Sequence, residues 1–580
     1  MEILNQAGGI AIIGAGPAGM FAYKAFIETA GCPRNITIFE KGNHPGMGMP
    51  YSVMGANTEH VTNVSANEIP DIVIPIKDWL QKAPTTMLQK FGISIENFNE
   101  YKVLPRLLFG EYLSAQFDML KTKAKEAGIK THLILNTSVV DAIDDPENGQ
   151  VKVITADNVA YQFEHIIICT GHRWPKTSEG KVPGWFDSPY PPAKLASITN
   201  YPVAIKGASL TAIDAIRTLS RSNGKFVETD NGLRYELNDT SPDFRLVLHS
   251  LGGLMPAIRF HLQDSHLSQG HSFTEEEITA IRDQHQGFVP LDFVFDKIFK
   301  QPLEEADAGL YADIHEMNME SFVEHMMNLR EKLDAFTLFK AEYREADKSI
   351  KRRQSVYWKE MLAVLSYEMN YAAKHFSAED MIRLKKNLMP LISIIIAFVP
   401  QSSCEELIAL YDANVLSMQP VDIKSEVIPM PTGGCRYTFT NELGEKTEER
   451  YNMFVNAVGQ SAFMLQDFIF PSLVQNKTVS EAHTRFKDPA AAVAEIDAGS
   501  KQVVSTAPGE YWLKVPGITI NDHFQVLDEF GKYNPRIYIM AVPYISGLNP
   551  DYSGLDFCER ASGVVAQRLV KDLVGVEKVA

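Results

Sequence analysis

One strand-turn-helix stretch near the N-terminus constrains this chain more than any other feature. Four apolar residues, 10–13, lead directly into a glycine-rich turn. The glycines stand in the spacing G-x-G-x-x-G, at Gly14, Gly16 and Gly19. Glu40 closes the next apolar run about 20 positions later, where dinucleotide-binding units carry an acid that accepts a hydrogen bond from a ribose hydroxyl. An ordinary glycine-rich turn would leave this acid unexplained, so the stretch predicts a dinucleotide site.

Each glycine of the turn has a physical role. Gly14 allows the tight strand-to-helix turn, and Gly16 lets a pyrophosphate approach the backbone. Gly19 lets the helix pack closely against the sheet. The helix N-terminus that begins at Pro17 and Ala18 supplies positive potential and free amide groups beside the phosphates.

Length and charge limit the classes of protein and partner. A chain of 580 residues is too long for a single hydrophobic core, so two or three domains are expected. The 72 acidic residues outnumber the 55 basic residues and give a net charge of −17. This balance argues against nucleic acid or an anionic membrane as the main partner, but it is compatible with a small-molecule substrate.

The sequence also bears on location and metal content. No basic region precedes the first apolar run, which ends in the glycine turn, so we expect a cytoplasmic protein without a signal peptide. The longest apolar run, residues 388–399, contains Pro390 and is shorter than a membrane helix of about 20 residues. The cysteines form no C-x-x-C pair and no metal-binding spacing, so we expect neither disulfide-reductase chemistry nor structural zinc.

The loop after Glu40 is rich in glycine and polar residues. It leaves the carboxyl end of a Rossmann strand, where ligands bind in open α/β sheets, so it is the expected flavin-ring segment. Its candidate ligand-contacting residues are Lys41, His44, Met47, Gly48, Tyr51, Ser52, His60, Asn63 and Ser65. The alternative is that the two histidines are structural hydrogen-bonding residues and that Met47 fills a core.

Two pieces of this loop carry a family resemblance. Residues 46–52 (GMGMPYS) and 60–66 (HVTNVSA) resemble the signature G-x-G-x-x-Y-S followed by H-L-x-N-x-x-A of the FAD/NAD(P)-binding protein family. The run 44–47 (HPGM) is similar to a loop beside the flavin in microbial flavin-dependent N-hydroxylating monooxygenases. The resemblance implies a two-dinucleotide flavoprotein with these residues around the reactive ring: His44, Met47, Tyr51, His60 and Asn63.

The same resemblance implies two further FAD contacts. The apolar strand over 165–169 ends at Thr170 and Gly171, which would contact the adenosine half; the alternative is a strand that simply ends at a glycine. Near the other end, a loop and a helix over 555–573 would face the flavin, where the helix dipole stabilises a reduced ring. The loop residues concerned are Asn549, Ser553 and Gly554.

A second strand-turn-helix unit begins at Tyr201. It reads G-x-S-x-x-A, with serine at the middle position where the family usually has glycine, so a pyrophosphate has less room to approach the backbone than at the first turn. The candidate contacts are Gly207, Ser209, Leu210 and Thr211. The next strand ends in His249 and Ser250 instead of a carboxylate, with Arg259 nearby, which favours NADPH because an acid would repel a 2′-phosphate.

The expected fold class is α/β, with two Rossmann-like dinucleotide-binding domains, the second inserted in the first, plus a mostly helical insertion. We assign residues 1–195 and 526–580 to the FAD domain, and residues 196–255 and 401–525 to the NAD(P) domain and its connecting strands. Residues 256–400 form the helical insertion, a candidate substrate pocket. Two of its helices have capping-box starts, at Thr274 and Ser377.

The resemblance implies an FAD- and NADPH-dependent monooxygenase that hydroxylates a small polar substrate, for example at an amine nitrogen. In such enzymes NADPH reduces FAD, molecular oxygen forms a C4a-hydroperoxide, and the protein excludes water. Two alternatives stay open. One is a dehydrogenase or reductase without oxygen insertion, and the other is a flavin-binding protein without turnover.

Overall fold

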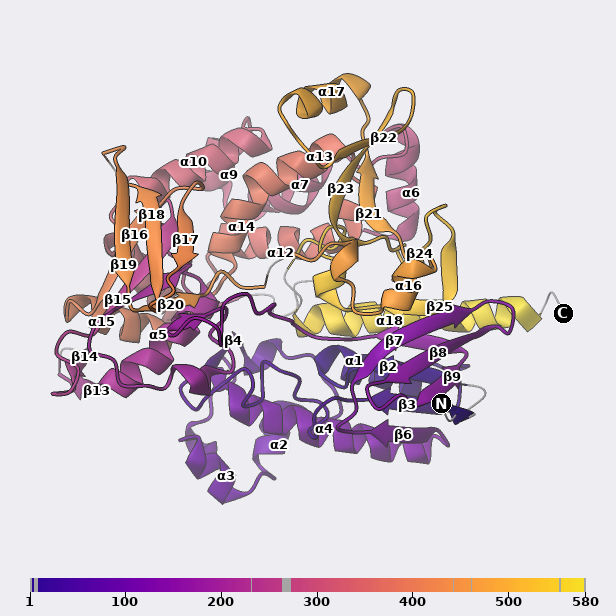
Figure 1. Cartoon of the computed structure of the whole chain (residues 1–580), viewed down its shortest axis with the longest axis horizontal. Coiled ribbons are helices and arrows are strands. Elements are labelled where there is room, and N and C mark those ends of the chain that lie inside the picture. Colours follow the sequence, from indigo (N-terminus) through magenta and orange to yellow (C-terminus); the bar gives the residue numbers. More distant parts are fainter. Residues whose placement is uncertain are drawn as a thin grey trace.

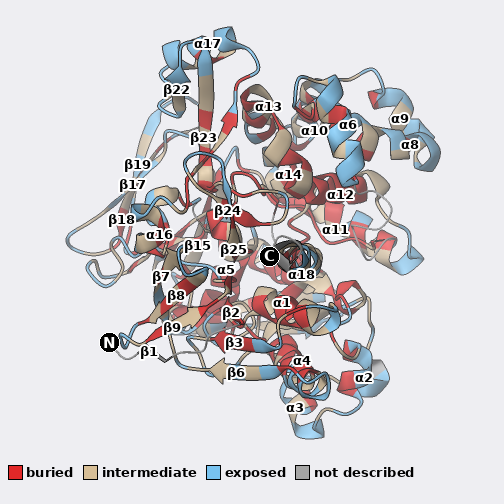
Figure 2. Ribbon diagram, turned by 90° about the vertical axis from the view of Figure 1, so that its right-hand side faces the viewer, coloured by how far each residue is buried: buried red, intermediate tan, exposed pale blue. Residues whose placement is uncertain are grey.

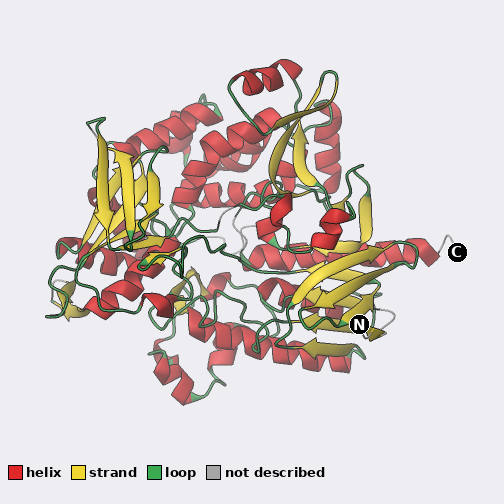
Figure 3. Ribbon diagram, in the orientation of Figure 1, coloured by secondary structure: helices red, strands yellow, loops and turns green. Residues whose placement is uncertain are grey.

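The computed structural model describes residues 3–4, 9–230, 232–262, 273–441, 443–460, 462–551 and 554–577. Two mainly parallel sheets, each with its own helices, stand side by side, and a helical region lies across them (Figures 1 and 3). This arrangement confirms the α/β class with a helical insertion.

The first sheet has six strands in the order β24–β25–β10–β2–β3–β6. Its strands are β2 (Ile10–Ile13), β3 (Asn35–Phe39), β6 (Lys130–Ile134), β10 (His165–Ile168), β24 (Gln525–Leu527) and β25 (Tyr533–Ile539). β10 pairs in parallel with both β2 and β25, so segments from both ends of the chain form one sheet. The helices that pack on it include α1 (Pro17–Glu28), α4 (Arg106–Glu126) and α18 (Leu555–Glu577).

The second sheet is wholly parallel, in the order β11–β20–β12–β15–β16. Its strands are β11 (Trp185–Phe186), β12 (Pro202–Lys206), β15 (Arg245–Leu251), β16 (Leu416–Val421) and β20 (Met453–Asn456). All of them lie between β10 and β25 in the sequence, which confirms that the second unit is inserted in the first. β11 falls within residues 1–195, so the second sheet begins earlier than our division of the chain placed it.

Five smaller sheets complete the described part of the fold. They are β1 (Ile3–Leu4) with β7 (Val139–Asp145), β8 (Gln150–Thr155) and β9 (Ala160–Phe163); β4 (Val61–Ser65) with β5 (Val103–Pro105); β13 (Gly224–Thr229) with β14 (Gly232–Leu237); β17 (Glu426–Pro429) with β18 (Cys435–Thr440) and β19 (Lys446–Tyr451); and β21 (Glu481–Arg485) with β22 (Val503–Ala507) and β23 (Glu510–Ile518). Aromatic residues of β18 and β19 form a separate core against β12 and β20.

The helical region extends from residue 275 to residue 412. It contains α6 (Glu275–Gln284), α7 (Leu291–Phe295), α8 (Gln301–Ala306), α9 (Ala308–Ile314), α10 (Met319–Glu331), α11 (Ala335–Arg352), α12 (Tyr357–Ala372), α13 (Ala378–Arg383), α14 (Met389–Ile395) and α15 (Gln401–Asp412). Thr274 and Ser377 cap α6 and α13 as the sequence predicted. The remaining helices are α2 (Ile76–Leu80), α3 (Thr85–Lys90), α5 (Leu210–Asn223), α16 (Pro471–Gln475) and α17 (Pro489–Asp497).

α12 is the most enclosed of these helices, buried along nearly its whole length (Figure 2). It joins the helical region to the C-terminal segment, because Ser366 and Asn370 both hydrogen-bond Asp551. In the part of the chain that the structure describes, no helix combines the length and the apolar content needed to cross a membrane.

Gly19 generates a stability prediction. A Cβ at Gly19 would lie 1.9 Å from the Gly14 carbonyl oxygen, so α1 cannot keep its place if a methyl group is added. We expect Gly19→Ala to destabilise the protein by about 1–3 kcal/mol or more, seen as a lower melting temperature. Gly563→Ala is the matched helical control, because its Cβ would meet nothing within 4 Å, and it should be neutral or stabilising. Equal melting temperatures for the two variants would contradict the packing argument.

Candidate functional site

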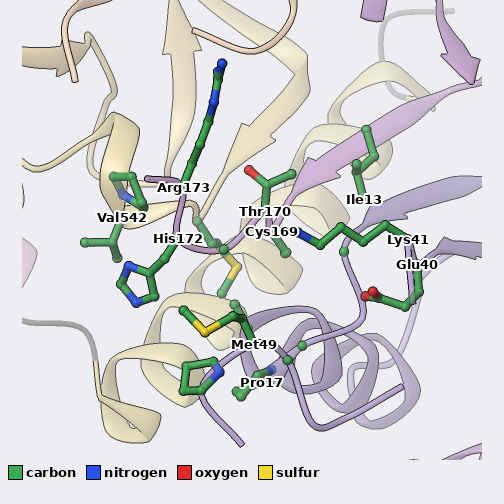
Figure 4. A pocket seen from close by; sticks show the side chains of 18 of the residues that line it. Ile13, Pro17, Glu40, Lys41, Met49, Cys169, Thr170, His172, Arg173 and Val542 are labelled. Atoms are coloured by element: carbon green, nitrogen blue, oxygen red, sulfur yellow. The ribbon is translucent and has the colours of Figure 1, made fainter. Parts of the chain in front are cut away.

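A cavity of about 500 Å³ lies at the carboxyl ends of β2, β3 and β10 (Figure 4). Its walls come from the start of α1, the loop after β3, the turn after β10, the segment after β25, and the first turn of α18. This volume is in the usual range for cofactor and ligand sites. The predicted residues that line it are Gly14, Gly16, Pro17, Ala18, Glu40, Lys41, His44, Gly48, Tyr51, Ser52, Thr170, Gly171 and Gly554.

The start of α1 forms one wall of this cavity. Gly16 is the N-cap residue and Pro17 the first helical residue, so no side chain caps the first-turn amides. Those amides have no partner within the helix and can bind an anion. A Cβ at Gly16 would lie 3.2 Å from the Cα of Gly48, so two glycines pass closely here. Gly19 lies behind this wall and acts through packing.

Glu40 ends the neighbouring strand with its carboxylate fixed. One carboxylate oxygen accepts from the Ala15 N–H and the other from the Gly42 N–H, each at 2.8 Å. Each oxygen keeps a lone pair with which to accept from a ribose hydroxyl. Lys41 lies beside Glu40 on the same side of the cavity (Figure 4).

The turn after β10 carries an unsatisfied polar atom. The Thr170 hydroxyl is buried and has no hydrogen-bond partner among the described residues. Buried polar groups are nearly always hydrogen-bonded, so this hydroxyl fits a ligand that donates to it or accepts from it. With the Gly16 amide cradle and Glu40, it meets the requirements of a dinucleotide such as FAD.

The loop that carries Tyr51 rests on α4. A Cβ at Gly110 would lie 2.1 Å from the Tyr51 carbonyl oxygen, so helix and loop are in direct backbone contact. The Tyr51 ring packs edge-on against Phe109, with 4.8 Å between ring centroids. Burial raises the pKa of Tyr51 to about 12 despite the nearby Arg106, so the phenol stays protonated. Met47 is buried outside the cavity, and Met49 lines it instead.

His60 is placed away from the cavity, contrary to our expectation. Its side chain is 0% exposed. Its Nδ1 accepts from the Asn57 N–H at 2.8 Å, and its Nε2 donates to the Asp214 carbonyl at 3.1 Å. Burial holds the pKa of His60 below its ordinary value, so the ring is neutral. The histidine therefore joins the FAD domain to α5, which is the structural role left open as the alternative.

Asn63 and Ser65 are also outside the cavity. Arg259 donates to the Asn63 carbonyl and, at 2.9 Å, to the Ser65 hydroxyl. It also forms a buried ion pair with Glu68. Arg259 is therefore committed to this cluster and does not serve a 2′-phosphate.

The C-terminal loop contributes to the cavity only in part. Gly554 and Leu555 line it and bring the start of α18 to the side facing α1. Asn549 is fully buried outside the cavity, and its side-chain amide has no hydrogen-bond partner among the described residues. Ser553 lies outside the described residues.

The second turn repeats the geometry of the first. Gly14 and Gly207 have φ of +102° and +111°, a region that favours glycine. The Gly14 N–H donates to the Phe39 carbonyl at 2.8 Å, and the Gly207 N–H donates to the His249 carbonyl at 2.9 Å. Ser209 is the N-cap residue of α5, is exposed, and makes no side-chain capping bond. Leu210 and Thr211 follow it, both half-buried.

The expected 2′-phosphate contact at His249 is wrong. His249 is 1% exposed, and its ring stacks on Tyr437 with 4.0 Å between centroids and 12° between planes. Burial lowers the pKa of His249 to about 4, so it carries no charge at neutral pH. The Ser250 hydroxyl donates to the Leu254 carbonyl at 2.9 Å. Both side chains are used within the fold.

Sequence reasoning missed the residues that join the two units. Nδ1 of His172 lies 2.7 Å from Oε1 of Gln460, and the Arg173 N–H donates to the same oxygen at 3.2 Å. His172 and Arg173 line the cavity, whereas Gln460 follows β20 of the second sheet. The carboxyl edges of the two sheets therefore meet at the cavity. The position of His172 and Arg173 directly after the Thr170-Gly171 turn was the available signal.

Comparison with known proteins agrees with this geometry. Residues 11–173 match the model of the FAD-NAD(P)-binding family. The N-terminal domain is an FAD-NAD(P)-binding domain. This confirms the family resemblance and the expected cofactor types, FAD with a nicotinamide dinucleotide. Residues 274–396 match the model of the YdhS-like middle domain. The uncharacterized protein YdhS of Escherichia coli (strain K12) is 26% identical over 472 residues, 80% of this chain and 85% of that protein.

Solved structures with a similar arrangement are more distant. The ornithine N-hydroxylase of Kutzneria sp. 744 is 13% identical, with 97% of this chain and 99% of that chain covered and a TM-score of 0.44. The ornithine hydroxylase PvdA of Pseudomonas aeruginosa is 10% identical, with 98% and 100% covered and a TM-score of 0.49. The bacillithiol disulfide reductase Bdr of Staphylococcus aureus is 11% identical, with 98% and 99% covered and a TM-score of 0.41. At these values none of them assigns a reaction to this chain.

The Gly16 cradle predicts a defect in cofactor binding. Gly16→Val should give protein with little or no bound FAD, because the side chain would fill the approach of the pyrophosphate to the first-turn amides. The measurement is flavin absorbance per protein after purification, with the melting temperature as a check on folding. Ser209→Val makes a similar change at the corresponding position of the second turn and should keep full flavin content. Full occupancy in folded Gly16→Val would exclude this turn as the FAD site.

Proposed function

We propose that the protein is an FAD-dependent NAD(P)H oxidoreductase. FAD would occupy the cavity, and a nicotinamide dinucleotide would bind at the Gly207–Ser209 turn. The observation that carries the proposal is the repeated glycine turn: two turns of the same geometry, on two sheets whose carboxyl edges meet through His172 and Gln460. Ligands of open α/β sheets bind at such edges.

Different residues of the cavity would bind different parts of FAD. The amides after Gly16 would bind the pyrophosphate, Glu40 a ribose, and Thr170 a further polar group. The N-terminus of α18 would stabilise negative charge on the opposite side of the cavity. FAD, when bound, supplies the hydride-accepting chemistry, and the protein supplies orientation and exclusion of water.

We further propose monooxygenation of a small polar substrate by molecular oxygen, for example at an amine nitrogen. The resemblance of residues 44–47 to a loop of flavin-dependent N-hydroxylating monooxygenases supports this. The apolar wall formed by Met49, Val542 and Pro543 would help to keep water out. Thiol chemistry has no support. Burial raises the pKa of Cys558 to about 12 and also raises that of Cys169, so both cavity cysteines remain protonated and poorly nucleophilic.

We propose NADPH as the reductant, although His249, Ser250 and Arg259 do not support this preference. Residues 249–253, at the carboxyl end of β15, include no acid that would repel a 2′-phosphate. Anaerobic mixing with each nucleotide should reduce the flavin faster with NADPH than with NADH. Equal rates would remove the preference, and no reduction by either nucleotide would overturn the oxidoreductase proposal.

Oxygen use separates the proposed reaction from the alternatives. After reduction by NADPH, oxygen consumption should rise when the substrate is present in a screen of amines and amino acids, and a hydroxylated product should form. Reduction followed by electron transfer without oxygen insertion would favour a dehydrogenase or reductase instead.

Ser209 tests the second nucleotide site. Ser209→Asp should raise the Kd for NADPH at least tenfold, because its charge would oppose the pyrophosphate at the start of α5. Ser209→Ala at the same position removes the hydroxyl without adding charge and should change the Kd little. Flavin content should stay full in both variants. An unchanged Kd in Ser209→Asp would move the nicotinamide dinucleotide away from this turn.

A further inference from the structure

We propose that Asp214 is a positioning residue that sets how the second dinucleotide turn faces the FAD cavity. Asp214 lies on α5, four residues after the helix begins, and it is 4% exposed. The proposal rests on the proposed function, since it concerns hydride transfer between the two nucleotides. It gives a role to a cluster that touches neither turn.

The Asp214 carboxylate is held by two side chains from outside α5. Arg106 donates from Nη1 to Oδ2 at 2.5 Å, and the Tyr190 hydroxyl donates to the same oxygen at 2.7 Å. Among the described residues, Arg106 is the cation that pairs with this carboxylate. The ion pair is enclosed on both sides, with 14% of the Arg106 side chain and 6% of the Asp214 side chain exposed.

Arg106 is itself fixed to the FAD domain. It is the first residue of α4, its Nε donates to the Val61 carbonyl at 2.8 Å, and its backbone N–H donates to the His60 carbonyl at 3.0 Å. One turn further along, Gly110 of the same helix touches the backbone of Tyr51 in the cavity wall. α4 therefore links the cavity wall to Asp214 through a short, buried path.

A second set of contacts holds the same part of α5. His60 donates to the Asp214 carbonyl, and the Thr218 hydroxyl donates to Glu59 at 2.7 Å. Asp214 and Thr218 are four residues apart and share one face of α5. Glu59 and His60 thus contact α5 at two successive turns. This contact gives a structural role to His60, which the sequence analysis had placed at the flavin ring.

A buried ion pair suits a positioning role better than a stabilising one. Such pairs often contribute little net stability compared with apolar packing, but separating them leaves two uncompensated charges in the interior. A shifted or rotated α5 would break the Arg106–Asp214 pair, so one relative orientation is strongly favoured. Hydride transfer depends on that orientation, because a displacement of about 1 Å can cost 10²-fold in rate.

The experiment measures flavin reduction by NADPH anaerobically in a stopped-flow instrument. Asp214→Asn keeps the shape and an acceptor for Tyr190 but removes the charge. We expect its limiting reduction rate to fall at least tenfold, while flavin content and the NADPH Kd stay near those of the parent. Photochemical reduction of the bound flavin, which needs no nucleotide, should be unchanged. An unchanged limiting rate, or a change confined to the Kd, would overturn the proposal.

Two further variants separate positioning from stability. The double variant Arg106→Met with Asp214→Leu replaces the pair by apolar side chains; we expect it to fold and still to reduce slowly, and a parent-like rate would refute the role. Glu406→Gln breaks another buried pair of α5, Arg217 with Glu406 at 2.9 Å, which holds α5 to α15; both helices pack in the hydrophobic core of the second sheet. It should lower the melting temperature but keep the parent's reduction rate. If the parent flavin is reduced by neither nucleotide, the proposed function fails first and the positioning role fails with it.

Discussion

The close approach of α1 to the strand-turn before it is the constraint on which the rest of the structure depends. Gly19 faces the Gly14 carbonyl with no room for a Cβ, and Gly14 in turn faces the Cys169 carbonyl at the end of β10. These contacts fix the start of α1 over the carboxyl edge of the first sheet. The free amides, Glu40 and the Thr170 turn then converge on one cavity because β2, β3 and β10 are neighbours in that sheet.

The features that depend on short stretches of chain could be predicted from the sequence. The glycine spacing, the acid after the next strand, the capped starts of α6 and α13, and the long C-terminal helix α18 all reflect local geometry. The convergence of both chain ends on one sheet came from the family resemblance, because no local pattern states which strands pair.

His60 and His249, whose positions the sequence analysis predicted wrongly, are held by partners that are distant in the sequence. His60 is defined by Asp214, 154 positions away, and His249 by aromatic residues of β18 and β19. His249 lies near the end of a Rossmann strand, where ligands usually bind, but an antiparallel sheet covers it. In both cases burial keeps the histidine ring neutral, and the ring contacts other residues of the protein instead of a ligand. The antiparallel sheets themselves gave too weak a signal to be separated from connecting strands.

α1 and α18 pack on the same sheet although they lie at opposite ends of the chain, and this affects the order in which parts of the protein can fold during synthesis. Lys24 of α1 forms an ion pair at 2.9 Å with Glu559 of α18, across 535 positions of sequence, and β10 pairs with β25 nearby. The second sheet and the helical region leave the ribosome before β25 and α18, so they can fold while the first sheet still lacks its last strands. Loops this long close slowly, and the cavity is complete only when they have closed. Capture of FAD in the cavity would then be a late event in biogenesis, after synthesis has reached α18.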